Sequence, residues 1–145
     1  MTPSTGQEPS TSAIYELKGK RVWVAGHRGM VGAALARRLA HEDCEVLIAD
    51  RNRVDLTRQA DVEAWMAEAK PEAVFLAAAR VGGILANRER PAEFIYENTA
   101  IATHVIHAAH EQGVEKLLFL GSSCIYPKMA SQPMTEDALL SGPLE

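Results

Sequence analysis

Apolar residues along this chain fall into four short continuous runs, separated by longer segments in which they recur every three or four positions. The first run is rich in β-branched residues, and the four runs cover residues 21–26, 45–50, 73–79 and 116–121. Continuous apolar runs of this length are typical of parallel strands that are buried on both faces. Segments with helical periodicity lie between them, over residues 30–42, 57–69 and 90–113. Because the two kinds of segment alternate, the sequence predicts an α/β fold with a parallel sheet made of right-handed βαβ units.

The two ends of the chain lack this alternation. The opening stretch, MTPSTGQEPSTSA, is rich in Ser, Thr, Pro and Gly and has almost no large apolar residue. Such a composition cannot bury enough apolar surface to fold, so residues 1–17 are expected to be a disordered tail and residues 18–145 the ordered domain. After residue 121 the composition is that of a loop, with one short possible helix.

Composition and charge exclude several classes of function. Apolar residues make up 47% of the chain, which is enough for a core, and the net charge of -4 argues against a broad nucleic-acid surface. No apolar run approaches the roughly 18 residues that a membrane span needs, so no membrane partner is expected. The two cysteines, Cys44 and Cys124, show neither disulfide nor metal spacing. We therefore expect a soluble, cytoplasmic protein.

Three histidines on the last predicted helix, His104, His107 and His110, raise the question of a metal site. Zinc proteases use His-Glu-x-x-His or its inverted form, and neither is present. Residues three apart also drift around a helix, so the three side chains cannot all point at one ion. No metal site is expected, and we assign these histidines to the helix surface or to an interface.

The first predicted strand runs into a glycine loop, GHRGMVG, that opens directly into a helix. Gly26 allows the sharp turn, Gly29 lets a ligand approach the main chain, and Gly32 lets the helix pack against the sheet. The helix N-terminus then presents unpaired N–H groups and the positive end of its dipole to an anion. This context favours dinucleotide binding over an ordinary tight turn. We expect a Rossmann-like, doubly wound sheet whose cofactor site also includes His27, Arg28, Met30 and Val31.

The residues after the second predicted strand bear on which dinucleotide binds. The strand ends at Asp50, and an acidic residue there usually accepts hydrogen bonds from the ribose and favours NAD. Arg51 and Arg53 follow at once, and Arg28 lies inside the glycine loop. Guanidinium groups suit the 2′-phosphate of NADP, although the same arginines also fit a solvated turn. The residues favour NADP.

The glycine spacing Gly-x-x-Gly-x-x-Gly resembles the short-chain dehydrogenase/reductase superfamily, in its extended, sugar-nucleotide branch. In that superfamily the residues just after the second strand cover the adenine, which implies this role for Asp55 and Leu56. Asp55 fits a cap of the following helix equally well. Three small residues follow the third strand: Ala77, Ala78 and Ala79. Their size would let a cofactor pass close to the main chain or let a helix pack closely.

The last predicted strand ends in the group GSSCIYPK. A serine hydroxyl at a strand end can donate a hydrogen bond to a substrate carbonyl and stabilise an enolate. A thiol whose pKa lies near neutrality can move protons, although a free cysteine is just as often a small packed residue. Local chemistry alone leaves both interpretations of Cys124 open, whereas Cys44 is assigned to packing.

The stretches VAGHRGMVG, LAAARVGGI, FIYEN, HVIHAAH and KLLFLGSSCIYPK together closely resemble the GDP-L-fucose synthase family. The resemblance implies an NADPH-dependent conversion of GDP-4-keto-6-deoxy-D-mannose to GDP-L-fucose, by epimerisation at C3 and C5 and then reduction at C4. It implies that Ser122 and Cys124 are catalytic, that a GDP-sugar is the substrate, and that the complete protein is a homodimer.

The resemblance also has a gap. The Tyr-x-x-x-Lys motif of the superfamily is absent, and Tyr126 does not replace it because no lysine follows at the required distance. We therefore expect the chain to be the N-terminal part of a Rossmann domain with an incomplete sheet, and to be inactive alone. Two alternatives stay open: another extended sugar-nucleotide epimerase or dehydratase, and a non-catalytic dinucleotide-binding module.

Overall fold

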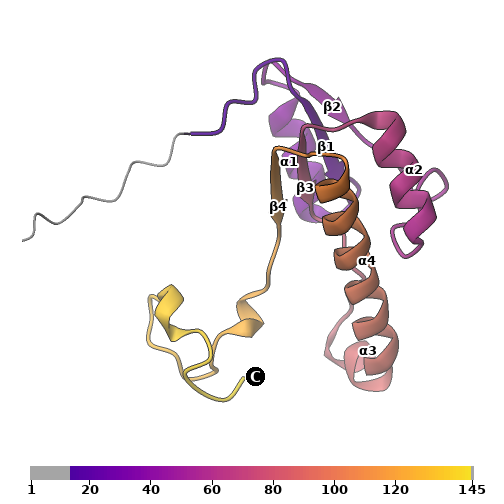
Figure 1. The fold of residues 1–145 in the computed structure, drawn as a ribbon. Helices are drawn as coiled ribbons and strands as arrows, with labels where there is room; N and C mark the ends of the chain where they lie inside the picture. Colours follow the sequence, from indigo (N-terminus) through magenta and orange to yellow (C-terminus); the bar gives the residue numbers. More distant parts are fainter. Residues whose placement is uncertain (1–13, 145) are drawn as a thin grey trace, which may run out of the picture.

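The computed structural model describes residues 14–144 and consists of one parallel sheet with helices on both faces (Figure 1). The strands are β1 (Arg21–Ala25), β2 (Glu45–Leu47), β3 (Ala73–Leu76) and β4 (Lys116–Phe119). The helices are α1 (Met30–Leu39), α2 (Gln59–Ala69), α3 (Ile84–Glu89) and α4 (Pro91–Glu111), and single 3-10 turns cover Ser123–Ile125 and Glu136–Ala138. The predicted α/β fold with a parallel sheet is confirmed.

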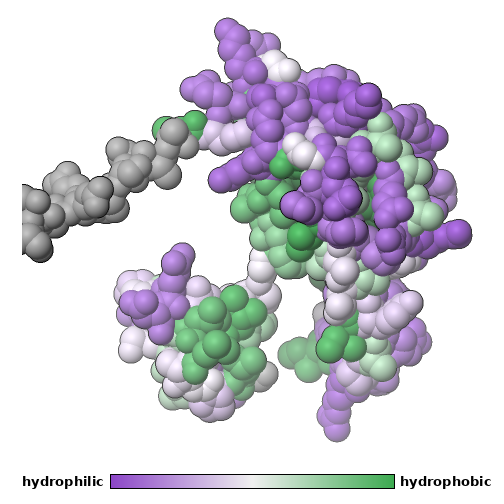
Figure 2. All heavy atoms as spheres, viewed as in Figure 1, coloured by the Kyte–Doolittle hydropathy of each residue, from purple (hydrophilic) through white to green (hydrophobic). Residues whose placement is uncertain are grey.

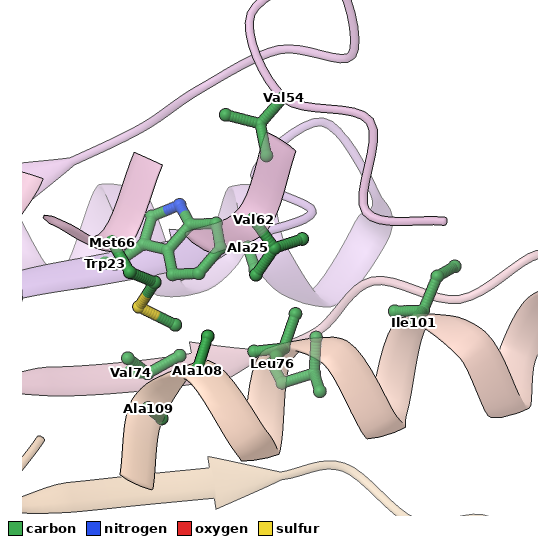
Figure 3. Packing of buried hydrophobic residues seen from close by; sticks show 11 residues of the cluster. Trp23, Ala25, Val54, Val62, Met66, Val74, Leu76, Ile101, Ala108 and Ala109 are labelled. Carbon is green, nitrogen blue, oxygen red and sulfur yellow. The ribbon is translucent and has the colours of Figure 1, made fainter. Parts of the chain in front are cut away.

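The strand order is β2-β1-β3-β4, and all neighbouring pairs are parallel. Side chains of β1 alternate between the two faces because successive residues of a strand point to opposite sides. Val22 and Val24 join Leu39 of α1 in one cluster, whereas Trp23 and Ala25 join residues of α2 and α4 in the other. α1 therefore covers one face of the sheet, and α2 and α4 cover the other, where Figure 3 shows Met66 and Ala108 beside Trp23 and Val74.

The edge strands differ from the prediction. The central strands β1 and β3 are buried on both faces, but Leu118 and Phe119 of β4 are about half exposed. The residues of β2 are only exposed or half-buried as well. The expectation that all strands are buried on both faces is wrong for both edge strands, because each has only one neighbour in the sheet and incomplete cover from the helices. The sequence analysis also missed α3, a helix of six residues that is too short to show a periodic pattern.

The two ends of the domain are described only in part. Residues 1–13 of the predicted tail lie outside the described residues, whereas Tyr15 and Leu17 pack against the cluster on the α1 face. The boundary at residue 18 stays a prediction. At the other end, residues 121–144 form a separate segment that follows β4 and stands apart from the sheet and helices (Figures 1 and 2). It folds back on itself through a hydrogen bond from the Lys128 N–H to the Pro143 carbonyl, 3.1 Å.

A charge cluster joins the amino ends of the strands, and we call it the amino-edge cluster. The ammonium of Lys20 donates to Glu72 at 2.9 Å and to Glu115 at 2.8 Å, and the Tyr15 hydroxyl donates to Glu115 at 3.0 Å. The second carboxylate oxygen of Glu72 accepts from the Arg21 N–H at 3.0 Å. Hydrogen bonds to Glu115 and Glu72 raise the pKa of Lys20, and the bond from Lys20 lowers the pKa of each glutamate. The cluster ties β1, β3 and β4 together.

Within residues 14–144, no helix has the length and apolar character needed to cross a membrane.

Candidate functional site

A cavity of about 660 Å³ opens at the carboxyl edge of the sheet, where β1 and β3 lie side by side. From β1 the chain crosses to β2 on one side, and from β3 it crosses to β4 on the other. The loops that leave the two strands therefore diverge, and in open α/β sheets this divergence is the place where ligands bind. Three loops form the walls: the glycine loop, the loop after β2 and the loop after β3.

Two glycines of the glycine loop are required by the fold itself. Gly26 has a φ of +91°, and a Cβ there would lie 2.8 Å from the main chain of Ala77 and Ala78. A Cβ on Gly32 would lie 2.1 Å from the Gly26 carbonyl oxygen, so α1 packs directly on the loop. Both contacts are with main-chain atoms, which cannot move aside. These two glycines hold the loop against β3 and α1.

Gly29 differs from the other two glycines. It is the N-cap of α1, with a φ of -72°, and a Cβ there would meet only the Gly26 carbonyl oxygen, at 3.4 Å. The fold therefore tolerates a side chain at this position, and Gly29 itself lines the cavity. Among residues 14–144, no side chain caps the N-terminus of α1, and the first turn of the helix has no acidic residue. Such a helix end favours an anion.

The loop after β2 holds its acidic residue within its own turn. One oxygen of Asp50 accepts from the N–H groups of Asn52 and Arg53, at 3.1 and 3.3 Å. The other lies 3.4 Å from the guanidinium of Arg28. Arg51 lies 3.6 Å from Asp55, and the side chains of Arg28 and Arg51 are both 77% exposed. Two loosely paired guanidinium groups thus stand beside the cavity, while Asp50 is engaged with its own loop and with Arg28.

Arg53 lies apart from these two arginines. Its guanidinium pairs with both carboxylate oxygens of Glu68 on α2 and lies over the Trp65 ring, 5.9 Å from the ring centroid. It does not line the cavity. The sequence analysis treated Arg51 and Arg53 as equivalent candidates, and the structure separates them.

Asp55 shapes the same loop. Its carboxylate accepts from the Thr57 N–H at 3.0 Å and from the Thr57 hydroxyl at 2.7 Å. Burial alone would raise the pKa of Asp55, but the hydrogen bonds from Thr57 and the charge of Arg51 outweigh it, so the pKa is below its ordinary value. Asp55 therefore stabilises a turn before α2 and does not cap the helix, whose N-cap is Arg58.

The loop after β3 is fixed to α4 by one asparagine. The Asn98 amide accepts from the Arg80 N–H at 2.7 Å and donates to the Arg80 carbonyl at 3.0 Å. The Arg80 guanidinium pairs with Glu97 and lies over the Phe94 ring, 5.0 Å from its centroid. Each of these partners is on α4, so the helix determines where this wall of the cavity stands.

The structure brings most of the predicted cofactor residues together. Those that line the cavity are Gly26, His27, Arg28, Gly29, Arg51, Asp55, Leu56, Ala78 and Ala79. Those that do not line it are Met30, Val31, Gly32, Arg53 and Ala77. Their roles toward a ligand stay predictions.

Several cavity residues were missed by the sequence analysis. Arg80 follows directly after the predicted alanines, and this position was the available signal for it. Glu97 and Ile101 are four residues apart on α4 and both line the cavity, so helical spacing links them. Thr57 follows the predicted Leu56 in the same way, whereas Trp23 gave no signal, because its place in the wall depends on the tertiary structure.

Ser122 and Cys124 lie beyond β4, outside the residues that line the cavity. The Ser122 hydroxyl oxygen accepts from the Cys124 N–H at 3.2 Å, and Cys124 is exposed. Their catalytic roles stay predictions. Of the three histidines on α4, His107 and His110 are exposed, whereas His104 is partly buried and bonds to the loop after β2.

Comparisons with known proteins place the chain in a family. The NAD dependent epimerase/dehydratase family matches residues 22–145. The chain is 62% identical over 132 residues to a GDP-L-fucose synthase of Sinorhizobium fredii, covering 91% of this chain and 42% of the relative. It is 52% identical over 127 residues to GDP-L-fucose synthase of Escherichia coli, covering 87% of this chain and 40% of the relative.

Among solved structures, the chain resembles MlghC, a GDP-mannoheptose C4 reductase from Campylobacter jejuni with NADP bound. The TM-score is 0.81 at 38% sequence identity, over 88% of this chain and 40% of that one. The chain thus spans less than half the length of the relatives that it matches. The family match covers nearly all of the described residues, and the chain belongs to the NAD dependent epimerase/dehydratase family.

Proposed function

We propose that the chain is the NADP-binding part of a GDP-L-fucose synthase, which epimerises GDP-4-keto-6-deoxy-D-mannose at C3 and C5 and reduces it at C4. The observation that carries the proposal is the cavity at the carboxyl edge, where an uncapped helix N-terminus and two loosely paired arginines surround space suited to an anionic dinucleotide. The names of the S. fredii and E. coli relatives support the substrate, and the NADP bound to the C. jejuni reductase supports the cofactor.

The cavity fits a dinucleotide in its shape as well as its charge. The fold does not require a glycine at position 29, because a Cβ there would meet no neighbour closer than 3.4 Å. The missing side chain instead lets a pyrophosphate contact the main chain. The wall from Val54 to Thr57, with Ala78 and Ile101, offers apolar surface for the adenine. When bound, NADPH supplies the hydride for the reduction at C4.

The choice of NADP over NAD rests on Asp50. In an NAD site this carboxylate would accept hydrogen bonds from the ribose hydroxyls. Here its oxygens already accept from two N–H groups of its own turn and contact Arg28. Arg28 and Arg51 are exposed beside it, and guanidinium groups bind phosphate with charge-assisted hydrogen bonds. We assign the 2′-phosphate to these two arginines.

The cofactor proposal is tested by titrating the chain with NADP and comparing two glycine substitutions. Gly29→Ala should fold as well as the unmodified chain yet weaken NADP binding at least tenfold, because the added methyl group enters the cavity. Gly83→Ala is the matched control: Gly83 is also a helix N-cap with an ordinary φ, and a Cβ there meets nothing within 4 Å. An unmodified chain that binds no NADP, or a Gly29→Ala chain that binds it normally, would refute the proposal.

For catalysis we propose that Ser122 and Cys124 divide the work. The Ser122 hydroxyl accepts from Cys124 N–H through a lone pair, which leaves its proton free to donate to the C4 carbonyl of the substrate. That bond stabilises the enolate formed when a base removes the proton from C3 or C5, because both carbons neighbour the ketone. The Cys124 thiolate removes this proton and becomes a thiol. Inversion of the carbon then needs a proton delivered to the opposite face of the enolate, which a second acid of the complete protein supplies.

The catalytic proposal is tested in a full-length protein that carries this chain. In deuterated water and without NADPH, that protein should exchange the substrate hydrogens at C3 and C5. Cys124→Ser should lose most of the exchange while binding NADPH normally, because a serine hydroxyl is far less acidic than a thiol. Cys44→Ser is the control. Exchange at the unmodified rate in Cys124→Ser would mean that Cys124 serves only in packing.

We also propose that the complete protein pairs through α4 as a homodimer. Ile95 and Tyr96 are about 70% exposed on this helix and border a shallow groove with Thr99 and Thr103. Sedimentation of the full-length protein with Tyr96→Glu should give monomers where the unmodified protein gives dimers. Unchanged dimers would place the interface elsewhere.

A further inference from the structure

One histidine of α4 joins the helix to the loop that forms a wall of the cavity. The Nδ1 atom of His104 lies 3.2 Å from the main-chain carbonyl oxygen of Leu56, a residue 48 positions earlier in the sequence. Leu56 lines the cavity with Val54, Asp55 and Thr57, and its side chain packs against the core beneath. The contact thus links the surface of α4 to the wall assigned to the adenine.

The partner of His104 determines where its proton lies. A carbonyl oxygen can only accept a hydrogen bond, so Nδ1 must carry the hydrogen and donate it. In the neutral imidazole, Nε2 is then the unprotonated nitrogen. Neither neighbour on the same helix makes such a contact, since His107 and His110 are both exposed.

We propose that His104 is a positioning residue for the cofactor site: its Nδ1–H holds the Leu56 carbonyl and thereby fixes the Val54–Thr57 wall against α4. The other hydrogen bonds of this wall are local. The Val54 N–H donates to the Asp50 carbonyl at 3.0 Å, and the Thr57 N–H donates to the Asp55 carboxylate at 3.0 Å. They shape the turn but do not attach it to another element, whereas His104 does.

α4 therefore fixes two walls of the cavity from successive turns. Asn98 holds the main chain of Arg80 in the loop after β3, and His104 holds that of Leu56 in the loop after β2. Ile101 lies between them and lines the cavity. Asn98 and His104 both belong to α4, so a single rigid helix sets the spacing of the two loops. This inference rests on the proposed binding of NADP in the cavity.

The test compares three substitutions of His104 in the 145-residue chain. His104→Leu keeps the apolar volume but removes the donor, and it should weaken NADP binding roughly three- to tenfold, the usual effect of one hydrogen bond. His104→Asn places an amide N–H near the position of Nδ1–H and should restore the binding. His104→Gln places its amide further out and should not. His107→Leu, an exposed histidine of the same helix, is the matched control and should bind as the unmodified chain does.

Two measurements without any ligand separate this inference from the proposed function. The side-chain nitrogen spectrum of the free chain should show His104 with its proton on Nδ1. Amide hydrogen exchange over residues 54–57 should be faster in His104→Leu, at an unchanged thermal midpoint, and normal in His104→Asn. These results support the positioning role even if the chain binds no NADP, which would refute only the proposed function. A proton on Nε2, unchanged exchange in His104→Leu, or failure of His104→Asn to restore it would overturn the inference.

Discussion

Both edges of the sheet carry charged side chains, and they pair them differently. At the amino edge, Lys20 is bonded to both Glu72 and Glu115 at 2.8–2.9 Å. At the carboxyl edge, Arg28 and Arg51 lie 3.4 and 3.6 Å from their carboxylates and are largely exposed beside a cavity. Charges that satisfy one another hold strands together, whereas loosely paired cations around open space remain available to an anionic ligand. The carboxyl edge also has a close pair, Arg80 with Glu97, so the difference between the two edges lies in the loose pairing of Arg28 and Arg51.

The largest expected effect concerns the loop on which the carboxyl edge is built. Gly32→Ala should destabilise the chain by about 3 kcal/mol or more, because the new Cβ would lie 2.1 Å from the Gly26 carbonyl oxygen. The helix propensity of alanine, better than that of glycine by about 1 kcal/mol, is too small to compensate. Urea unfolding followed by circular dichroism measures the difference. A Gly32→Ala chain as stable as Gly83→Ala would show that α1 does not pack on the loop.

Next in size is the effect of removing one loosely paired cation. Arg51→Ala should weaken NADP binding by about 1.5–3 kcal/mol, or roughly ten- to a hundredfold, and leave NAD binding nearly unchanged. Arg53→Ala removes the same charge from the same loop, but Arg53 is engaged with Glu68 and Trp65, so NADP and NAD should be affected about equally. Calorimetric titration with both dinucleotides gives the ratio. If Arg53→Ala changed the preference for NADP over NAD more than Arg51→Ala did, the 2′-phosphate would have to be assigned to Arg53 instead of Arg51.

The two cysteines extend the comparison to thiol chemistry. Cys44 lies just before β2 at the amino edge, where burial, with the charges of Glu42 and Asp43, raises its pKa. Cys124 lies beyond β4 and is exposed. Iodoacetamide should therefore modify Cys124 roughly tenfold or more faster than Cys44 in the folded chain, because the thiolate is the reactive form. Mass spectrometry of the timed reaction, with the urea-unfolded chain as control, measures both rates. Equal rates in the folded chain would contradict the described burial of Cys44.

The smallest expected effect is the pH dependence of the amino-edge cluster. Glu72 and Glu115 have lowered pKa values, so their contribution to stability is present above about pH 4.3 and is lost as the pH falls through the folded-state values. The pKa of Lys20 is raised, so its contribution is present below about pH 10.4 and is lost only as the pH rises through its folded-state value. Solvent and salt reach the cluster, which keeps the effect small.

The variant Lys20→Met tests the direction of this pH dependence of stability. It should lower the thermal midpoint modestly near pH 7, and its midpoint should fall less between pH 5 and pH 3 than that of the unmodified chain. NADP affinity should not change, because the amino-edge cluster lies at the opposite end of the strands from the cavity. An altered NADP affinity in Lys20→Met would mean that the two edges are coupled through the sheet.

The sequence predicted the features that depend on local pattern. Alternating apolar runs and periodic segments identified the strands and the three longer helices, and the glycine loop identified the edge at which the cavity lies. The sequence did not predict contacts between residues that are far apart along the chain. The Asn98–Arg80 and His104–Leu56 bonds join residues 18 and 48 positions apart, and nothing in either segment alone specifies its partner. Arg51 and Arg53 look alike in sequence because only the position of α2 decides that one of them meets Glu68.

The two tryptophans of the chain have an optical consequence. Trp23 lines the cavity, and its ring centroid lies 6.0 Å from that of Trp65, with the ring planes inclined at 55°. Two indoles this close and inclined exchange excitation, which gives a paired signal in circular dichroism that depends on their mutual angle. The emission of indole overlaps the absorption of a reduced nicotinamide ring, so NADPH in the cavity would quench the fluorescence of Trp23. The unlabelled chain thus contains its own reporter of occupancy, and Trp23→Phe would remove the paired signal in circular dichroism while leaving Trp65 as the fluorophore.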